Sequence, residues 1–83
     1  MALEWGGHGI RVNAVSPGTI TTPRARDHGP DPVRDRAVPL RRRGTPEEIA
    51  GAVLFLLSDL AAGVSAEVMY VDGGFSQVAG AAA

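Results

Sequence analysis

The sequence has no cysteine and no lysine, and each absence excludes a kind of chemistry. Without thiols there can be neither a disulfide framework nor a thiolate zinc site. Without a lysine amine, no side chain in these residues could form a Schiff base with a substrate. The two histidines, His8 and His28, have no neighbours at the spacing of metal ligands, so we expect no metal site.

Long apolar runs are also missing. No run approaches the roughly 18 residues that a membrane-spanning helix needs. The first residues, MALEWGGHGIRV, lack the basic and apolar regions of a signal peptide. The composition, 45% hydrophobic and 20% charged with a net charge of −1, is that of a globular protein. We therefore expect a cytoplasmic protein without a membrane partner.

Basic residues are concentrated in one segment. Residues 24–43 contain seven arginines and three aspartates, whereas the rest of the chain contains one arginine and six acidic residues. Such a segment can bind phosphate backbones, but the interleaved aspartates and the lack of aromatic residues argue against a nucleic-acid platform. We expect no nucleic-acid partner. An acidic substrate or carrier stays open, and solvated loop charges are the simpler interpretation.

The stretch IRVNAVSPG predicts a strand followed by a sharp turn. Apolar residues alternate with others over residues 10–15, which is the period of a strand. Pro17 lacks a ladder donor and Gly18 tolerates unusual backbone angles, so the strand should end there. Because Gly18 has no side chain, another group could approach its backbone closely.

The next segments predict a long loop and a helix. Residues 23–44 show no periodicity and contain several prolines, which is typical of a lid-like loop. A short helical turn is expected near 33–38. The stretch TPEE that follows has the pattern of a capping box and predicts a helix over 45–60 with a wide apolar stripe.

The run VMYV followed by DGG predicts a second strand over 68–74. The run is continuously apolar, which is typical of a parallel strand that is covered on both faces. Asp72 is interpreted as the cap of a turn, and the Gly73-Gly74 pair as an ordinary turn rather than a ligand contact. Residues 75–83, FSQVAGAAA, are expected to form a loose tail.

A strand, a helix and a strand in this order join two parallel strands by a crossover. Two parallel strands and one full helix cannot cover both faces of a sheet, and the first five residues read as the end of a further helix. We therefore expect a C-terminal fragment of a larger α/β domain. The alternative is a small intact protein that completes itself by oligomerising.

Three segments in the same order resemble the C-terminal third of the short-chain dehydrogenase/reductase family: IRVNAVSPGTITTP, PLRRRGTPEEIAGAVLFLLSD and VMYVDGG. The resemblance covers residues 2–75. It implies that residues 1–83 are part of one Rossmann-type doubly wound parallel sheet, arranged as strand, lid, helix and strand. In that fold a dinucleotide binds at the carboxyl ends of the strands.

The resemblance implies roles for four residues in the segment 10–22. Pro17 and Gly18 would form the turn beside the nicotinamide of NAD or NADP. The backbone of Ile20 and the hydroxyl of Thr22 would hold its carboxamide. For the neighbouring Thr19 and Thr21, side-chain turns with their own backbone are the simpler expectation. Residues 23–44 would be the substrate lid.

The implied activity is that of an NAD(P)-dependent oxidoreductase, which interconverts a carbonyl and an alcohol on a small-molecule substrate by hydride transfer. The last strand and the helix before it would help to form a dimer or tetramer. The family's glycine-rich pyrophosphate turn and its Tyr-x-x-x-Lys pair are not in the sequence, whose one tyrosine, Tyr70, lies in a predicted strand. We therefore assign no catalytic residue and expect the chain alone to be inactive.

A different class of function stays open, namely a stand-alone, non-catalytic interaction or oligomerisation module. The sequence also departs from the family pattern at two positions where a glycine is usual. These positions hold Arg41, in the segment PLRRR, and Ala66, just before the second strand. The expected effects are altered close packing at Ala66 and a tolerated change in a loop at Arg41.

Overall fold

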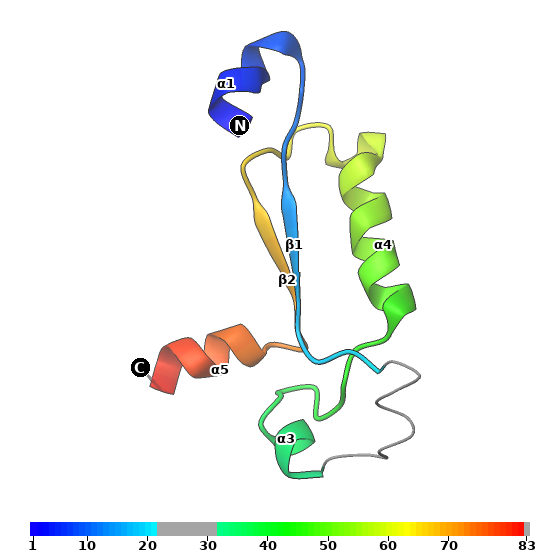
Figure 1. Cartoon of the computed structure of the whole chain (residues 1–83), viewed down its shortest axis with the longest axis vertical. Helices are drawn as coiled ribbons and strands as arrows, with labels where there is room; N and C mark the ends of the chain where they lie inside the picture. Colours follow the sequence, from blue (N-terminus) through cyan, green and yellow to red (C-terminus); the bar gives the residue numbers. More distant parts are fainter. Residues whose placement is uncertain (22–31, 83) are drawn as a thin grey trace.

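The computed structural model describes residues 1–21 and 32–82. It shows a two-stranded parallel sheet, one long helix against the sheet, and short helices at both ends (Figure 1). Within the described ranges, none of the helices combines the length and the hydropathy of a membrane span. The elements in chain order are α1 (Ala2–Trp5), the 3-10 turn η1 (Gly6–His8), β1 (Ala14–Pro17), α3 (Pro32–Arg36), α4 (Pro46–Leu57), the 3-10 turn η2 (Asp59–Ala61), β2 (Val68–Val71) and α5 (Phe75–Ala82).

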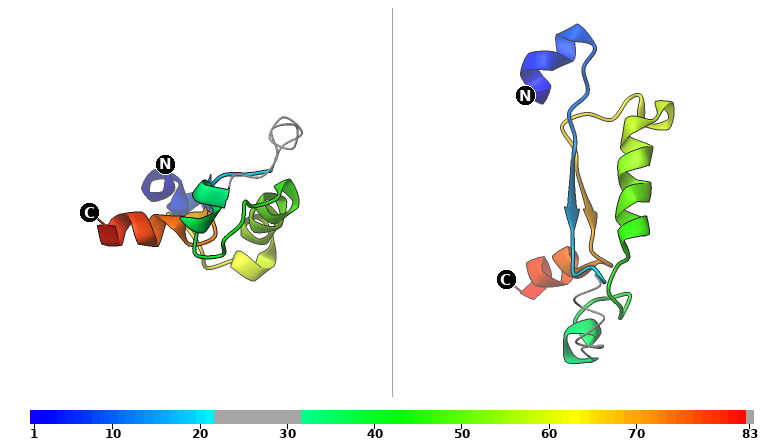
Figure 2. Two further views of the ribbon diagram at one scale, coloured as in Figure 1. Left: turned by 90° about the horizontal axis from the view of Figure 1, so that it is seen from below. Right: turned by 45° about the vertical axis from the view of Figure 1, so that its right-hand side comes forward.

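β1 and β2 are parallel, with Ala14 opposite Val68 and Pro17 opposite Val71. Helix α4 connects them in sequence and runs along one face of the pair in the views of Figures 1 and 2. This is the arrangement that the order of strand, helix and strand predicts, and the α/β class is confirmed.

β1 begins later than the alternation of residues predicts. Residues 10–13 are outside the strand because β2 begins only opposite Ala14. Before that point the two segments are joined by separate bonds: the N–H of Val12 donates to Ser65 Oγ at 3.2 Å, and the Val12 carbonyl accepts the N–H of Ala66 at 2.8 Å. The alternation of apolar residues predicts which face of the sheet each side chain lies on. The hydrogen bonds of a strand also require a partner strand alongside it.

Helix α4 starts where the TPEE pattern predicts. The Thr45 hydroxyl accepts the N–H of Glu48 at 3.2 Å, and the Glu48 carboxylate accepts the N–H of Thr45 at 2.9 Å, so the capping box is complete. The helix ends at Leu57, earlier than expected, because Ser58 adopts an extended conformation with ψ 167° and the turn η2 follows.

The expectation of a loose tail after β2 is wrong, because residues 75–82 form α5. Asp72 accounts for the start of this helix: its two carboxylate oxygens accept the N–H groups of Gly74 and Ser76, each at 2.9 Å. A side-chain oxygen that accepts otherwise unpaired N–H groups stabilises the start of a helix. The turn-capping role that the sequence predicts for Asp72 therefore extends to a helix.

The loop predicted over 23–44 contains the short helix α3, close to the turn expected near 33–38. Residues 22–31 of this loop lie outside the described residues.

Few side chains are buried in the described residues. The buried hydrophobic residues are Val38, Leu56 and Ala61. The radius of gyration is 15.4 Å, whereas a compact chain of this length would have about 12 Å. On the face of β2 away from α4, Val68 is 45% exposed and Tyr70 is 56% exposed. Burial on both faces, which the sequence predicts for this strand, is therefore not reached within the described residues.

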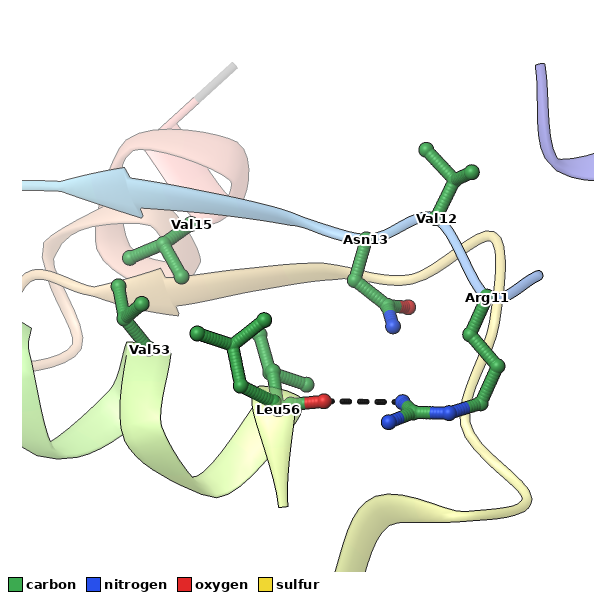
Figure 3. A pocket seen from close by; sticks show the side chains of 7 residues that line it. Arg11, Val12, Asn13, Val15, Val53 and Leu56 are labelled. Atoms are coloured by element: carbon green, nitrogen blue, oxygen red, sulfur yellow. Dashed lines mark hydrogen bonds between the residues drawn. The ribbon is translucent and has the colours of Figure 1, made fainter. Parts of the chain in front are cut away.

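Arg11 ties the start of the first strand segment to the end of α4 (Figure 3). Its guanidinium donates to the carbonyl oxygens of Leu56 at 2.9 Å and Val64 at 3.2 Å. Carbonyl groups in the last turn of a helix lack helical partners, and a cation there also complements the helix dipole. Asn13 donates to the same Val64 carbonyl at 2.9 Å. These bonds hold the connection between α4 and β2 against β1.

We expect Arg11→Met to lower the free energy of unfolding by about 2 kcal/mol, because the carbonyl groups lose a charged donor. Arg11→Lys should recover less than half of this loss, since one ammonium cannot reproduce the fork of donors. Urea unfolding followed by circular dichroism measures the effect in the encoded polypeptide, meaning the longest in-frame polypeptide that contains residues 1–83. Arg36→Met, at an exposed position of α3, is the control. Equal losses in Arg11→Met and Arg36→Met would contradict the role of Arg11.

Two residues other than glycine adopt the left-handed backbone conformation among the described residues, Arg41 with φ 59° and Ala66 with φ 62°. A Cβ makes this conformation unfavourable by roughly 1–2 kcal/mol. These are the two positions at which the sequence departs from the glycines of the family that it resembles. The departures therefore place a side chain where the backbone angles favour glycine.

We expect Ala66→Gly to raise the midpoint of thermal unfolding, because relief of the left-handed strain, roughly 1–2 kcal/mol, exceeds the added flexibility of glycine, about 0.5–1 kcal/mol. Ala62→Gly is the matched control in the same connection, since Ala62 has an ordinary helical φ of −57° and should only lose stability. The two substitutions should thus shift the midpoint in opposite directions. A lower midpoint for both would show that Ala66 carries no strain.

Candidate functional site

The carboxyl ends of β1 and β2 meet at one edge of the sheet. Pro17 and Val71 are opposite each other, and the N–H of Gly18 donates to the Val71 carbonyl at 3.1 Å. A Cβ at Gly18 would lie 2.8 Å from the Cα atom of Asp72. Only glycine lets the two segments approach in this way. In open α/β sheets, this edge is where ligands bind.

A hollow of about 330 Å³ opens at this edge. Its lining combines the turn after β1 with residues from α3, from the segment behind α3, and from the start of α5. These residues include Pro17, Gly18, Arg34, Val38, Asp72 and Phe75. The structure therefore brings two of the predicted site residues together with four that come from distant parts of the sequence.

Gly44 holds the backbone of Ile20 just beyond this turn. The N–H of Gly44 donates to the Thr19 carbonyl at 2.9 Å, and the Gly44 carbonyl accepts the N–H of Thr21 at 2.9 Å. These bonds use the groups on either side of Ile20, so the N–H and C=O of Ile20 itself point away from Gly44. Neither group bonds to a described residue. One residue therefore presents a donor and an acceptor side by side.

Of the four predicted cofactor contacts, three lie among the residues that the structure describes. Pro17 and Gly18 line the hollow, whereas Ile20 does not and offers only its backbone. The predicted contact of the Thr22 hydroxyl lies outside the described residues.

Asp72 brings a carboxylate to the hollow, but hydrogen bonds already satisfy its charge. Partial burial pushes the pKa of Asp72 upwards, yet the N–H groups of Ser76 and Gly74 outweigh this effect and hold the pKa below its ordinary value. The group is therefore ionised at neutral pH. Protonation would weaken the cap of α5, which makes this carboxylate a poor general base.

Two arginines of the basic segment form ion pairs beside the site. Both terminal nitrogens of Arg42 lie 2.8 Å from the carboxylate oxygens of Glu48. The Nε atom of Arg43 lies 3.6 Å from the carboxylate of Asp35, and these two side chains are only 14% and 21% exposed. The Arg42–Glu48 pair joins the chain just before Gly44 to α4, and the Arg43–Asp35 pair joins it to α3. Part of the charge in the basic segment is therefore structural.

A second hollow, of about 350 Å³, lies at the opposite end of the sheet against α4 (Figure 3). Val15, Val53 and Leu56 supply apolar walls, and the polar groups of Arg11 and Asn13 are bound to backbone carbonyls. This hollow lies away from the edge at which ligands bind in open α/β sheets, so the carboxyl edge is the better candidate. The described residues contain no cluster of three or more histidine, aspartate, glutamate or cysteine side chains that could hold a metal ion.

Sequence reasoning found one side of the carboxyl-edge hollow and missed the other. Arg34 and Val38 lie in a segment without periodicity, so no pattern predicted that they return to the sheet. Phe75 was missed because the residues after β2 lacked a visible helix signal. Asp72 could have been assigned, because it directly follows a strand predicted to be parallel to the first and must reach the same edge.

Comparison with known proteins gives the family. A sequence model described as enoyl-(acyl carrier protein) reductase matches residues 1–76. The crystal structure of an oxidoreductase of the short-chain dehydrogenase/reductase family from Burkholderia thailandensis matches with a TM-score of 0.83 at 38% identity, over 89% of this chain and 30% of that one. The chain belongs to the short-chain dehydrogenase/reductase family. The resemblance stated from the sequence is thereby confirmed, and the match lies in the C-terminal part of the family's Rossmann fold.

Curated members of the family show similar levels of identity. Galactitol 2-dehydrogenase from Rhizobium johnstonii is 45% identical over 82 residues, which cover 92% of this chain and 31% of that protein. L-Rhamnose 1-dehydrogenase (NAD(P)(+)) from a Sphingomonas species is 44% identical over 77 residues, which cover 88% and 30%. The chain therefore spans about a third of the length of these short-chain dehydrogenases.

Glu48 gives this family member an acid-sensitive contact at the start of α4. Hydrogen bonds from Arg42 and from the Thr45 backbone lower the pKa of Glu48 from 4.5 to about 2. Because the folded-state pKa lies below the unfolded value, the contact stabilises the fold above about pH 4.5 and is lost as the pH falls towards 2.

We expect the urea midpoint of the encoded polypeptide to fall between pH 4.5 and pH 2, and to fall less in Glu48→Gln. Glu47→Gln changes the neighbouring acidic residue of the same helical turn and should follow the wild type. An identical pH dependence in all three proteins would contradict the role of Glu48.

Proposed function

We propose that the polypeptide carrying this chain is an NAD(P)-dependent oxidoreductase that interconverts a carbonyl and an alcohol by hydride transfer. One observation carries the proposal: the N–H and C=O of Ile20 lie unpaired by described residues at the carboxyl edge of a parallel sheet. A primary carboxamide, such as that of nicotinamide, has a donor and an acceptor that match this pair. The proposed cofactor contacts are Pro17, Gly18, Ile20 and Thr22.

These residues would position the cofactor and would not react themselves. Gly18 keeps the turn in close contact with Asp72, and Ile20 would fix the orientation of the ring by its backbone. Orientation decides which face of the ring meets the substrate, and such positioning lowers the barrier to transfer. When bound, NAD or NADP supplies the hydride donor or acceptor.

Proton transfer would fall to residues beyond the 83 of this chain. The carboxylate at the hollow, Asp72, is engaged by backbone N–H groups. The sequence contains no lysine, and its one tyrosine, Tyr70, lies within β2. We therefore infer that residues 1–83 provide the nicotinamide side of a site whose acid and base lie elsewhere.

The relatives support a small-molecule carbonyl or alcohol as the substrate. Galactitol 2-dehydrogenase and L-rhamnose 1-dehydrogenase are named for the oxidation of sugar or sugar-alcohol hydroxyl groups, and the second name includes NAD(P). The matched family model carries the description of an enoyl reductase, so a 2-enoyl thioester belongs in the substrate panel beside ketones and alcohols.

We also propose a homo-oligomer, either a dimer or a tetramer. On α4, Leu54 is 66% exposed and Leu57 is 75% exposed. Exposed apolar surface of this kind is unfavourable in water and is typical of an interaction surface.

The alternative function is a non-catalytic interaction module, and the uncovered face of β2 favours it. Val68 and Tyr70 on that face would be buried by any partner that completes the sheet. Dinucleotide binding separates the two functions, because a module of this kind has no reason to keep a nicotinamide site.

We expect the encoded polypeptide to bind NADH or NADPH in a fluorescence titration. Gly18→Ala should weaken this binding at least about tenfold, because the new Cβ would displace the turn from Asp72. Gly63→Ala is the matched control, since nothing lies within 4 Å of a Cβ at Gly63. The isolated 83-residue chain should show no oxidoreductase activity with any substrate of the panel.

Failure of the encoded polypeptide to bind either dinucleotide would reject the proposed function in favour of the interaction module. Equal affinities of Gly18→Ala and Gly63→Ala would reject the assigned place of the nicotinamide. Turnover by the isolated chain would show that the acid and base lie within residues 1–83.

A further inference from the structure

The Gly73-Gly74 turn after β2 contacts the chain that leads from α3 to α4. Gly73 has φ 66°, and a Cβ there would lie 2.6 Å from the Cγ1 atom of Val38. Gly74 has φ 96°, and a Cβ there would lie 2.9 Å from the Cγ atom of Pro39. Two successive residues therefore rest on two successive glycines, and a side chain on either glycine would push them away.

A hydrogen bond and burial reinforce this contact. The N–H of Leu40 donates to the Gly73 carbonyl at 3.1 Å. Val38 is 8% exposed and is one of the few buried hydrophobic residues among those described. The Asp72 carboxylate accepts a hydrogen bond from the N–H of Gly74 at 2.9 Å, which holds the turn itself in place. The contact is therefore a packed junction.

The chain that rests on the turn leads directly to Gly44, which holds Ile20. The N–H of Arg41 donates to the Val38 carbonyl at 2.7 Å, which closes a tight turn. The two ion pairs described above then fix the residues before Gly44 to α3 and α4. A Cβ at Gly44 would lie 2.9 Å from Ile20 Cδ1, so these two residues are also in close contact. A continuous series of hydrogen bonds, ion pairs and close contacts therefore connects the glycine turn to the backbone of Ile20.

We propose that Gly73 and Gly74 are positioning residues, which set the place of residues 38–44 and, through Gly44, the place of the Ile20 backbone. The inference rests on the proposed nicotinamide site. Neither glycine needs to touch the cofactor in this role. The last strand then positions both walls of the site, one through the contact of Asp72 with Gly18 and the other through its glycine turn.

The test compares Gly73→Ala with Gly9→Ala in the encoded polypeptide. Gly9 has φ 76°, but nothing lies within 4 Å of a Cβ there, so this control carries the backbone strain without the contact. Two quantities are measured: hydrogen exchange of the Leu40 and Gly44 amides, and the dissociation constant for NADH or NADPH. Circular dichroism verifies that each variant is folded.

We expect Gly73→Ala to speed exchange at both amides and to weaken dinucleotide binding, each by about tenfold or more. Gly9→Ala should leave both quantities within about twofold of the wild type. Adding Val38→Ala to Gly73→Ala removes the nearest atom that the new Cβ meets, and it should restore most of the exchange protection at Gly44. Such a rescue would not follow from general destabilisation.

Pro39→Ala provides a milder variant should Gly73→Ala not fold, because it removes the ring atoms that rest on Gly74. It should speed exchange at Leu40 and Gly44 while leaving the exchange of α4 unchanged. Equal behaviour of Gly73→Ala and Gly9→Ala, or unchanged Gly44 exchange in the milder variant, would overturn the proposal. Absence of dinucleotide binding in the wild type would reject the proposed function, whereas the exchange results would still decide whether the turn positions residues 38–44.

Discussion

The parallel pairing of β1 with β2 is the contact on which the rest of the structure depends. It places residues 14–17 beside residues 68–71, and so it brings the turns that follow the two strands to the same edge. Closing so long a connection costs conformational entropy, and little of that cost is offset by a core, since few hydrophobic side chains are buried among the residues that the structure describes. Helix α4, the guanidinium of Arg11 and the bonds of Asn13 hold the connection against the strands.

Glycines at the carboxyl edge let neighbouring segments approach closely. Gly18 approaches Asp72, Gly44 approaches Ile20, and the turn after β2 approaches Val38 and Pro39. Each contact joins segments that are far apart in sequence. The shape of this edge therefore depends on backbone positions.

Backbone strain is tolerated in two connections of this chain. Arg41 and Ala66 keep left-handed backbone angles that favour glycine. Both lie in connections, where neighbouring bonds hold the backbone: the N–H of Arg41 is bound by Val38 and that of Ala66 by Val12. The surrounding contacts therefore hold these residues at left-handed φ angles, despite the conformational strain that a Cβ adds there.

From the sequence alone, local signals determined the α/β class, the capped start of α4, the second strand and the turn at Pro17 and Gly18, because each of these has a periodic or capping pattern of its own. Only the tertiary structure decided that Arg34, Val38 and Phe75 face that turn, that β1 begins at Ala14, and that residues 75–82 form a helix. The physical reason is that these features depend on partners distant in the sequence. A strand begins where its neighbour does, and an aperiodic segment takes its place from the glycines against which it packs.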